Sequence, residues 1–332
     1  MIDRPSEELL KLFRLSGDSD QSVAQQAQRE IAKAIQEPLR KGVMYGDVTG
    51  NIFERMQLEP GSSPEFPLDL LSPGTERDYT AYTNPGHGRI PERSVESDYV
   101  MIHTYGITNS IDFQLKYAYE ARWDIAKRAT KVMAAGLVKK INDDAWHTIL
   151  AAAVDRDILV YDDDAADGQF TKRLISLGKT LMLRNGGGNS VTATGRLTDL
   201  YMSPEGIEDV RNWGLDQLDE VSRREVYQSA ENGAPLTRIF GVNLNGLFEF
   251  GDGQEYQTFV TSDLGGILAS GDVELIIGLD LNARDSFVMP IKRPLEVFED
   301  MNLHRQQRQG YYCWQDCGFA VLDNRRVIAL SF

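Results

Sequence analysis

The feature that most constrains the fold is a long stretch of helical periodicity covering residues 113–153. Apolar or small side chains recur there at steps of three and four, so one face stays apolar for about eleven turns. These side chains are Leu115, Ala118, Tyr119, Ile125, Ala126, Ala129, Val132, Met133, Leu137, Ile141, Ala145 and Ile149. No proline interrupts the stretch, and a helix of this length would reach about 60 Å, longer than a compact domain needs. The stretch predicts a spine helix around which the other segments are organised.

Three residues indicate that this helix does not form a simple coiled coil. Arg122 and Lys140 fall on the apolar face, where they must extend toward solvent or find partners. Gly136 weakens the middle of the helix. We expect the helix to pack under a sheet, with Gly136 allowing a close approach or a slight bend.

Composition places the chain among ordinary globular proteins with about two domains. Its 332 residues are 42% hydrophobic and 26% charged, which leaves room for a sizeable core. No window holds 18 consecutive apolar residues, and the first residues lack the basic-then-apolar order of a secretory signal. We therefore expect a cytoplasmic origin and no contact with a membrane.

The net charge of −15 excludes a protein that reads nucleic-acid sequence, because such a protein needs a basic surface. The spine helix is a local exception, with seven basic residues against four acidic ones. The basic residues are Lys116, Arg122, Lys127, Arg128, Lys131, Lys139 and Lys140. We interpret them mainly as a solvated face with ion pairs such as Asp124 with Arg128.

Residues 1–48 predict an N-terminal helical arm. A first helix ends at Gly17, and a second begins near Ser19 and is stopped or kinked by Pro38. Both helices are too thinly apolar for a core of their own, so we expect them to pack against something else.

Residues 49–109 predict an extended loop. Six of the twelve prolines fall within 32 residues there, which excludes helix and a central strand. Strand-like ends are expected at residues 65–71 and 99–107. A loop of about sixty residues without a core is a functional arm or a disordered insert, and we favour an arm that lies on a neighbouring subunit.

The remainder of the chain predicts a mixed α+β organisation. A helix is expected at 170–184, a strand at 196–202, and a helix that begins at Pro204 after the N-cap Ser203. Residues 238–250 and 254–260 alternate like the two strands of a hairpin, and buried strands are expected at 273–278 and 286–289. Pro290 and Pro294 mark a boundary, after which residues 295–303, 311–322 and 326–332 form a closing antiparallel set.

Three short patterns imitate known binding motifs, and we reject each of them. Asp163, Asp167 and Gly168 suggest a calcium loop, but two required ligand positions hold Ala165 and Leu174. The triplet 178–180, Gly-Lys-Thr, imitates the end of a P-loop, but it lies inside a predicted helix and the earlier glycine is replaced by Arg173. Cys313 and Cys317 have no second pair, so we expect buried free thiols instead of a zinc site or a disulfide.

No catalytic, cofactor-binding or metal-ligating residue can be assigned. The four histidines are scattered, at His87, His103, His147 and His304, and no hydrolase, metalloprotease or dinucleotide motif is present. With 50 acidic residues, carboxylate pairs arise by chance and carry no argument. We predict that the chain is not an enzyme and that its projecting elements serve assembly.

The layout resembles the major capsid proteins of tailed bacteriophages, which share the Hong Kong 97-type fold. The local resemblance lies in residues 88–91 (Gly-Arg-Ile-Pro) and in the run 99–105 that leads to 109–112 (Asn-Ser-Ile-Asp). It implies an N-terminal arm at 1–48, an extended loop at 49–109, a peripheral domain with the spine helix at 110–155, an axial domain at 156–287, and return strands of the peripheral domain at 288–332. The correspondence covers nearly the whole chain.

The resemblance implies a structural function. Copies of the chain would form pentamers and hexamers of an icosahedral shell around double-stranded DNA, with nonspecific DNA contact at most, and the extended loop would lie across a neighbour. The protein would be part of the virion, present in the host cytoplasm during assembly. A portal and a separate scaffolding protein are the implied partners, since about 48 residues before the loop are too few for a fused scaffold, and a cementing protein is an optional one.

One departure from some members of the family concerns covalent cross-linking. Some relatives join subunits through an isopeptide bond from a lysine in the extended loop, but residues 42–115 of this chain contain no lysine. We expect noncovalent packing of the loop and arm instead. The alternatives are an encapsulin-type nanocompartment shell, an acidic enzyme with no recognisable motif, and a portal or tail component.

Overall fold

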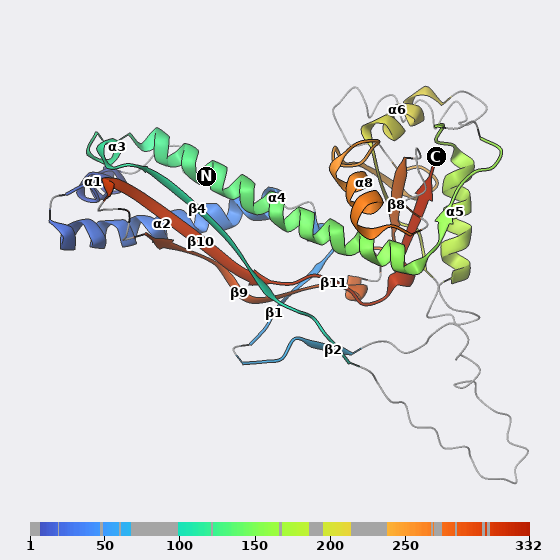
Figure 1. Ribbon diagram of the computed structural model, residues 1–332, viewed down its shortest axis with the longest axis horizontal. Coiled ribbons are helices and arrows are strands. Elements are labelled where there is room, and N and C mark those ends of the chain that lie inside the picture. The colour runs from blue at the N-terminus through green and yellow to red at the C-terminus, as the bar shows by residue number, and fades with distance from the viewer. Residues whose placement is uncertain are drawn as a thin grey trace, which may run out of the picture. The chain divides into compact units, whose positions relative to one another are not determined.

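The computed structural model describes residues 7–18, 20–46, 49–59, 61–67, 99–120, 122–165, 168–185, 195–213, 238–266, 268, 274–282, 284–300, 303 and 306–332. Its elements are labelled in Figure 1. The chain separates into two compact units, which are described one at a time. Unit 1 comprises Met1–Pro64, Met101–Ala145 and Val288–Phe319, and unit 2 comprises Glu65–Val100, Trp146–Phe287 and Ala320–Phe332.

Unit 1 is built on a sheet with the strand order β1-β9-β10-β4. The strands are β1 (Glu54–Gln57), β9 (Phe287–Glu299), β10 (Arg308–Cys317) and β4 (Tyr105–Gln114). β1 runs parallel to β9, and the other two pairs are antiparallel. Along β10 the buried side chains Tyr311, Cys313 and Cys317 lie on one face, as the period of a strand requires.

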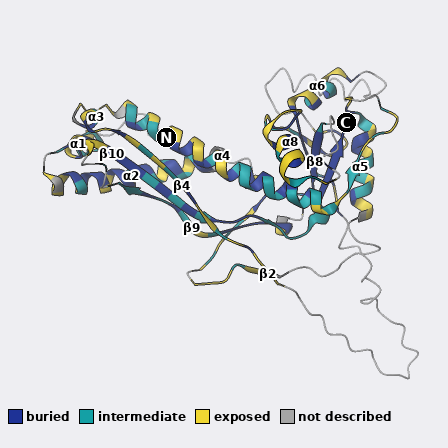
Figure 2. Cartoon of the chain, viewed as in Figure 1, coloured by how far each residue is buried: buried dark blue, intermediate teal, exposed yellow. Residues whose placement is uncertain are grey.

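Four α-helices among the described residues belong wholly or partly to unit 1. They are α1 (Glu7–Leu15), α2 (Gln21–Gly46), α3 (Leu115–Tyr119) and the first part of α4 (Trp123–Arg156). The arm predicted at 1–48 supplies α1 and α2, and both pack within the chain's own unit. The Phe13 ring lies 6.1 Å from the ring of Phe113 on β4, and Arg29 on α2 forms a 2.8 Å ion pair with Glu299 on β9. Figure 2 shows the buried faces of these elements.

The predicted spine helix is present as α4, but its predicted start is wrong. Residues 113 and 114 end β4, whose pairing with β10 extends to Gln114. Residues 115–119 form the separate short helix α3, and α4 begins at Trp123. Arg122 therefore lies outside α4, and its exposed side chain forms a 2.6 Å ion pair with Glu120. The apolar spacing in the sequence does not reveal where β4 ends and where α3 and α4 begin. The end of a strand and two successive helices can all place apolar residues on one side.

Gly136 allows α4 to approach the sheet closely, as the sequence predicts. A Cβ at this position would lie 2.7 Å from Nδ2 of Asn109 on β4. That amide nitrogen donates a 3.1 Å hydrogen bond to the carbonyl of Met133, one turn earlier on α4. The absence of a side chain at Gly136 leaves the space that this contact needs.

Proline does not end the helix or the strand at two places where the sequence predicts an interruption. Pro38 does not stop α2, which continues to Gly46 with Leu39 and Val43 buried. A kink at Pro38, the other outcome predicted, stays a prediction. Pro290 and Pro294 do not end a strand, because β9 runs through both, but the division between the two units falls close by, between Phe287 and Val288. Residues 294 and 295 of β9 together oppose the single residue 315 of β10, which is a β-bulge. Because the extra residue of a bulge is not paired, the missing N–H of Pro294 costs no hydrogen bond between the strands.

Unit 2 contains a sheet with the strand order β5-β12-β8-β6-β7. The strands are β5 (Leu159–Val160), β12 (Val327–Ser331), β8 (Leu275–Leu279), β6 (Asp199–Met202) and β7 (Asn243–Gly246). The helix α5 (Lys172–Asn185) packs on β12: a Cβ at Gly178 would lie 2.8 Å from Cδ2 of Leu330. The last strand thus belongs to this sheet, so the prediction that it joins β9 and β10 in one antiparallel set is wrong.

The prediction of a second hairpin strand at residues 254–260 is also wrong. Residues 255–264 form the helix α8 (Glu255–Phe259) and a π-helix (Val260–Leu264) instead of a strand. Tyr256 and Val260 are both buried and lie one helical turn apart, and Tyr256 packs near Phe250 and Trp146. By contrast α6 (Pro204–Asn212) begins as predicted, with Oγ of Ser203 accepting a 3.1 Å hydrogen bond from the amide of Gly206.

The predicted strand-like ends of the extended loop form a short two-stranded sheet. Its strands are β2 (Glu65–Pro67) and β3 (Tyr99–Met101). The rest of that loop, residues 68–98, lies outside the described residues. The remaining short elements are β11 (Ala320–Val321) and the 3-10 helices Thr49–Asn51, Arg284–Ser286 and Asn324–Arg326.

Candidate functional site

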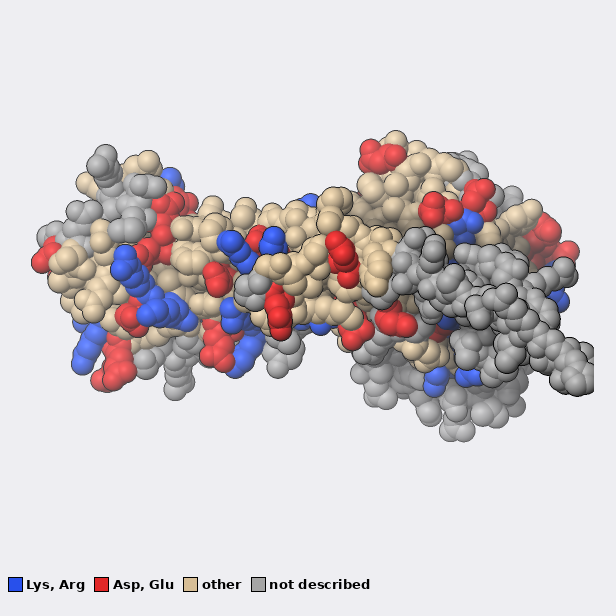
Figure 3. All heavy atoms as spheres, turned by 90° about the horizontal axis from the view of Figure 1, so that it is seen from below, with Lys and Arg blue, Asp and Glu red and all other residues tan. Residues whose placement is uncertain are grey.

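The basic residues of α4 lie on a mixed, solvated surface. Arg128, Lys131, Lys139 and Lys140 are exposed, and Figure 3 shows basic and acidic side chains interspersed on the face that it draws. The ion pair expected between Asp124 and Arg128 is not formed. Lys140 instead binds Asp144 at 2.7 Å, so its charge is partly compensated although its position interrupts the apolar pattern.

Asp144 also holds the start of β4. The Tyr105 hydroxyl donates a 2.9 Å hydrogen bond to Oδ2 of Asp144. Burial, together with this hydrogen bond and the carboxylate charge, raises the pKa of Tyr105. The phenol therefore stays neutral, which indicates a structural contact between β4 and α4.

The rejected motifs lie in settings that agree with their rejection. The Gly-Lys-Thr triplet lies inside α5, where Gly178 serves helix packing. Asp162 and Asp164, next to the calcium-like loop, both form ion pairs with Arg173, and Asp167 lies outside the described residues. Cys313 and Cys317 are buried free thiols, as predicted. Burial raises the pKa of Cys313 to about 11, so its reactive thiolate form is scarce at neutral pH.

The histidines are not brought together in the part of the chain that the structure describes. The His147 ring on α4 stacks on Phe259 at 3.8 Å, and His103 is exposed beyond β3. His87 and His304 lie outside the described residues. Among the described residues, no three His, Cys, Asp or Glu side chains are grouped so that they could hold a metal ion. A search of the described helices finds none with the length and apolar character needed to cross a membrane.

Exposed apolar side chains gather on β3, where the sequence predicts a strand but does not indicate that these side chains are exposed. Tyr99 is 63% exposed and Met101 is 53% exposed, and Val100 between them is also exposed. β3 pairs with the three-residue strand β2, and a two-stranded sheet alone is only marginally stable in water. Exposed apolar surface on such a two-stranded sheet is typical of a segment that another protein covers.

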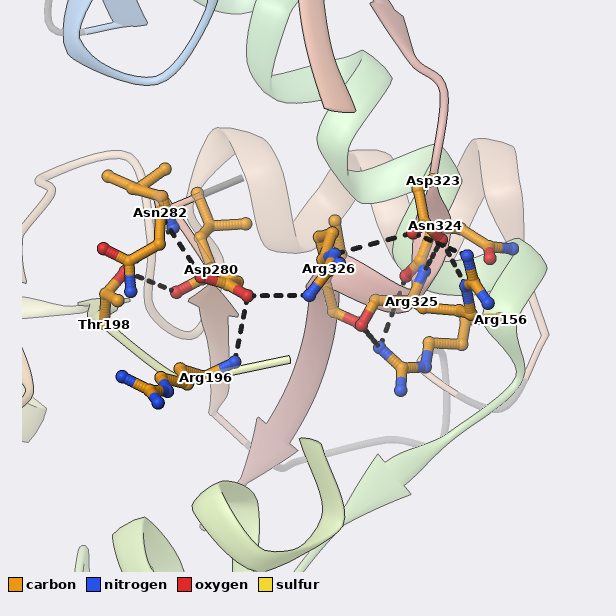
Figure 4. Close-up of polar contacts among 12 residues, drawn as sticks. Arg156, Arg196, Thr198, Asp280, Asn282, Asp323, Asn324, Arg325 and Arg326 are labelled. Atoms are coloured by element: carbon orange, nitrogen blue, oxygen red, sulfur yellow. Dashed lines mark hydrogen bonds and ion pairs between the residues drawn. The ribbon is translucent and has the colours of Figure 1, made fainter. Parts of the chain in front are cut away.

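A partly buried polar cluster in unit 2 fixes the turn before β12 (Figure 4). Arg156, the last residue of α4, donates from Nη1 to the carbonyls of Asn324 at 3.3 Å, Arg325 at 2.7 Å and Val327. Burial lowers the pKa of Arg156, while the nearby Asp323 opposes this effect. In the same turn, the side chains of Arg325 and Arg326 both form ion pairs with Asp323.

Asp280 is the centre of the second half of this cluster. Its carboxylate is 2% exposed. It accepts hydrogen bonds from the amides of Arg196 at 2.9 Å and Asn282 at 3.1 Å, and from Nη1 of Arg326 at 3.0 Å. All of these partners are protein groups that complete the fold, so the cluster is a structural anchor. The sequence gives no signal for it, since its members are up to 171 residues apart in number, as Arg156 and Val327 show.

A second carboxylate in unit 2, Glu274, is held in an acidic setting. The Ser203 hydroxyl, which caps α6, donates a hydrogen bond to Oε2 of Glu274. Burial raises the pKa of Glu274, and the neighbouring Glu205, Asp209 and Asp252 add to that effect, while the Ser203 hydrogen bond opposes it.

We expect Glu274→Gln to stabilise the protein at neutral pH. A carboxyl whose pKa is raised by folding contributes its stability below its unfolded pKa of about 4.3, and loses it as the pH rises through the folded pKa. Glutamine keeps an acceptor for Ser203 and removes the charge. Thermal unfolding of both proteins should show a higher Tm for the variant at pH 7.5 and convergence of the two values near pH 4.

The exposed Glu208→Gln on α6 is the control for that comparison. It removes one negative charge nearby without touching Ser203. A rise in Tm as large for Glu208→Gln as for Glu274→Gln would show that net charge, and not the burial of Glu274, is responsible.

Solved capsid structures match nearly the whole of this chain. The capsid protein of cyanophage Pam1 has a TM-score of 0.59 and 10% identity, with 88% of this chain and 92% of that chain covered. That of the bacteriophage PhiM1 mature capsid has a TM-score of 0.55 and 13% identity, with 86% of each chain covered. A virus-like particle from Pyrococcus furiosus has a TM-score of 0.50 and 10% identity, with 91% of this chain and 99% of that chain covered. These similarities confirm the predicted α+β, Hong Kong 97-like fold. No protein-family model and no curated protein matches the sequence.

Proposed function

We propose that this chain is the major capsid protein of a tailed bacteriophage. In this role it self-assembles into the pentamers and hexamers of an icosahedral shell that encloses double-stranded DNA. The observation that carries the proposal is the match to capsid structures over 86–88% of the chain, which includes both compact units. The chain has no enzymatic role in this proposal, and it is part of the virion after assembly in the host cytoplasm.

The described surface supports a subunit that is completed by its neighbours. The exposed residues Tyr99, Val100 and Met101 on β3 are apolar, and they stand at one end of the extended loop. In the proposed shell this loop lies across an adjacent subunit, which removes their apolar surface from water. The domain assignments stay as predicted, with the arm at 1–48, the loop at 49–109, peripheral segments at 110–155 and 288–332, and the axial domain at 156–287.

The net charge of −15 fits a container for DNA better than a protein that grips it. Contact with packaged DNA is nonspecific in this proposal. A separate scaffolding protein and a portal complete the assembly, and a cementing protein is an optional partner. These partners are implied by the resemblance to capsid proteins.

We expect mature particles to be held together without covalent bonds between subunits. Residues 42–115 contain no lysine, so an isopeptide bond from a loop lysine cannot form. In boiled, reduced particles this chain should run as one band near 37.3 kDa on a denaturing gel, whatever bands its partners add. Ladders of higher mass in mature particles, absent from freshly assembled ones, would contradict noncovalent stabilisation.

Negative-stain microscopy and light scattering of the expressed protein test the proposed function. The protein is expressed alone and together with the genes beside its own, because a scaffold and a portal are expected partners. Closed shells tens of nanometres across that contain DNA when the full set is present would support the capsid. A monodisperse monomer or dimer under both conditions would overturn shell formation.

A nanocompartment shell of the encapsulin type is the second candidate. The observation that favours it is the virus-like particle from Pyrococcus furiosus, of which 99% of the chain is matched. Such a compartment would hold a protein cargo in place of a genome. Nuclease-protected nucleic acid in purified particles supports the phage capsid, and a stoichiometric protein cargo without DNA supports the compartment.

A further inference from the structure

An exposed phenylalanine in unit 2 is held in a backbone conformation that suits it poorly. Phe240 has a φ angle of 50°, and its side chain is 53% exposed. With Gly241, at φ 80°, it forms the centre of a tight turn in which Ile239 and Val242 exchange two 2.9 Å backbone hydrogen bonds. Such a turn needs positive φ at both central residues, so it favours Asn, Asp or Gly, and a bulky residue there is strained. Because the ring is half exposed, packing within the subunit does not explain why the turn keeps it.

Two long side chains hold this turn in place. Nζ of Lys179 on α5 donates a 2.6 Å hydrogen bond to the carbonyl of Phe240, and Nε of Arg238 donates a 3.0 Å hydrogen bond to the carbonyl of Gly241. Strained backbone that its surroundings hold in place is concentrated at functional sites. An aromatic side chain on a fixed element is also typical of the few residues that carry the binding energy of an interface.

The surface beside the Phe240 ring is basic. Arg238 comes directly before the turn, and Arg196 lies at the same level of the sheet. Asp199 of β6 pairs with Asn243 of β7 in parallel register, and Arg196 precedes Asp199 by three residues, as Phe240 precedes Asn243. Both arginines are exposed. This end of β6 and β7 therefore presents an aromatic ring between cations.

The opposite end of β7 is acidic and carries a second exposed phenylalanine. Phe248 follows β7 and is 83% exposed. Because β6 and β7 are parallel, the start of α6 lies at this end too, where a Cβ at Gly251 would lie 3.4 Å from Oε2 of Glu205. Glu205 and Asp252 are exposed. Burial raises the pKa of Glu274, and Glu205 and Asp252 raise it further, so negative charge gathers at this end of the sheet.

One sheet thus has a basic end and an acidic end, each with an exposed phenylalanine. Copies of a chain with a net charge of −15 repel one another in general, and two acidic ends placed together would add to that repulsion. A basic end and an acidic end attract each other and fix the orientation of the contact. Because the two surfaces differ, each copy uses one of them toward one neighbour and the other toward the next, and such a contact closes into a ring when the rotation fits.

We infer that the turn around Phe240 docks on the acidic end of the same sheet in a second copy of the chain. Phe240 contacts Phe248 of the neighbouring copy, and Arg238 pairs with Asp252 of that copy. The contact removes two exposed rings from water and lets them form an aromatic pair. The inference rests on the proposed function, and it names the charges and rings that join copies within a pentamer or hexamer.

Charge reversal in the full-length protein tests this contact. Arg238→Glu and Asp252→Arg should each weaken association at least tenfold, because each places like charges face to face. The double variant exchanges the two charges and should recover the association of the wild type, since the attractive pair is restored with its signs reversed. Asp163→Arg, at another exposed acidic position of unit 2, changes the net charge as Asp252→Arg does and should not weaken association. Sedimentation velocity over a range of concentrations measures each protein, expressed alone and with the genes beside its own.

A further variant separates docking from folding. Phe240→Asn removes the ring and supplies a residue that the turn favours. Its Tm should equal or exceed that of the wild type, while its association falls at least tenfold. A variant that lost stability and association together would show that the ring serves the fold of unit 2.

The outcomes distinguish this contact from the proposed shell. Shells that form unaltered in Arg238→Glu and Asp252→Arg, or a double variant that fails to recover, would overturn the inference and leave the proposed function standing. Charge-dependent rings that never close into shells would support the contact and contradict the shell. A wild-type protein that stays monomeric in every preparation would overturn both.

Discussion

Replacing Trp146 with alanine is expected to lower the free energy of unfolding by about 3–5 kcal/mol, the range for large aromatic residues removed from a core. Trp146 is 1% exposed. Its ring lies 4.9 Å from that of Tyr201 on β6 and 5.4 Å from that of Phe250, both nearly edge-on. The substitution removes these contacts and leaves a cavity between α4 and the sheet of unit 2, since neighbouring aromatic rings cannot collapse into the space.

Urea unfolding followed by circular dichroism measures this loss. Phe248→Ala is the matched control, because it also removes a large aromatic ring from unit 2 but from a side chain that is 83% exposed. It should change the stability by no more than about 0.5 kcal/mol. Trp146→Phe should fall between the two variants. Equal effects of Trp146→Ala and Phe248→Ala would show that α4 is not held by this aromatic cluster.

The second large effect is expected for Asp280→Ala, which should also cost about 3–5 kcal/mol. The substitution leaves the guanidinium of Arg326 without its nearest carboxylate, and the Arg326 side chain is only 13% exposed. It also removes the acceptor of the Arg196 amide. Arg326 would keep only its 3.5 Å contact with Asp323, and the Arg196 amide would lose its acceptor. These two losses account for the cost, and the net strength of the ion pair need not be large.

A double variant separates these causes. Asp280→Leu combined with Arg326→Met replaces both charges with apolar groups, so it should be less destabilising than Asp280→Leu alone. Asp163→Ala, at an exposed acidic position of the same unit, is the control for lost charge. If the double variant were as unstable as the sum of its single changes, the unpaired charge would not be the cause.

Local sequence patterns predicted most of the elements and the fold class. The helix at 172–185, the capped start of α6 and the buried strand β8 follow from periodicity and from the residues that begin or end them. The predicted absence of catalytic, cofactor and metal residues stays a prediction. Its basis is the lack of any motif, and a site formed by residues distant in sequence has no local signature.

The errors share a physical cause, which is that tertiary contacts override local preference. Pro294 is tolerated in β9 because a bulge needs no donor at that point, and the bulge exists only because β10 lies beside β9. Residues 255–264 became helical because this buries both Tyr256 and Val260 and packs Tyr256 against Phe250 and Trp146.

The sequence by itself predicted a long helix with an apolar face where α4 lies, the mixed α+β fold class, and the lack of familiar motifs. These are properties of neighbouring residues, so they can be read from spacing and composition. Only the tertiary structure decided where α4 begins, which sheet receives the last strand, and which charges are buried together. Those outcomes depend on contacts such as Arg40 with Leu295, residues 255 positions apart, and no local pattern encodes the approach of such distant segments.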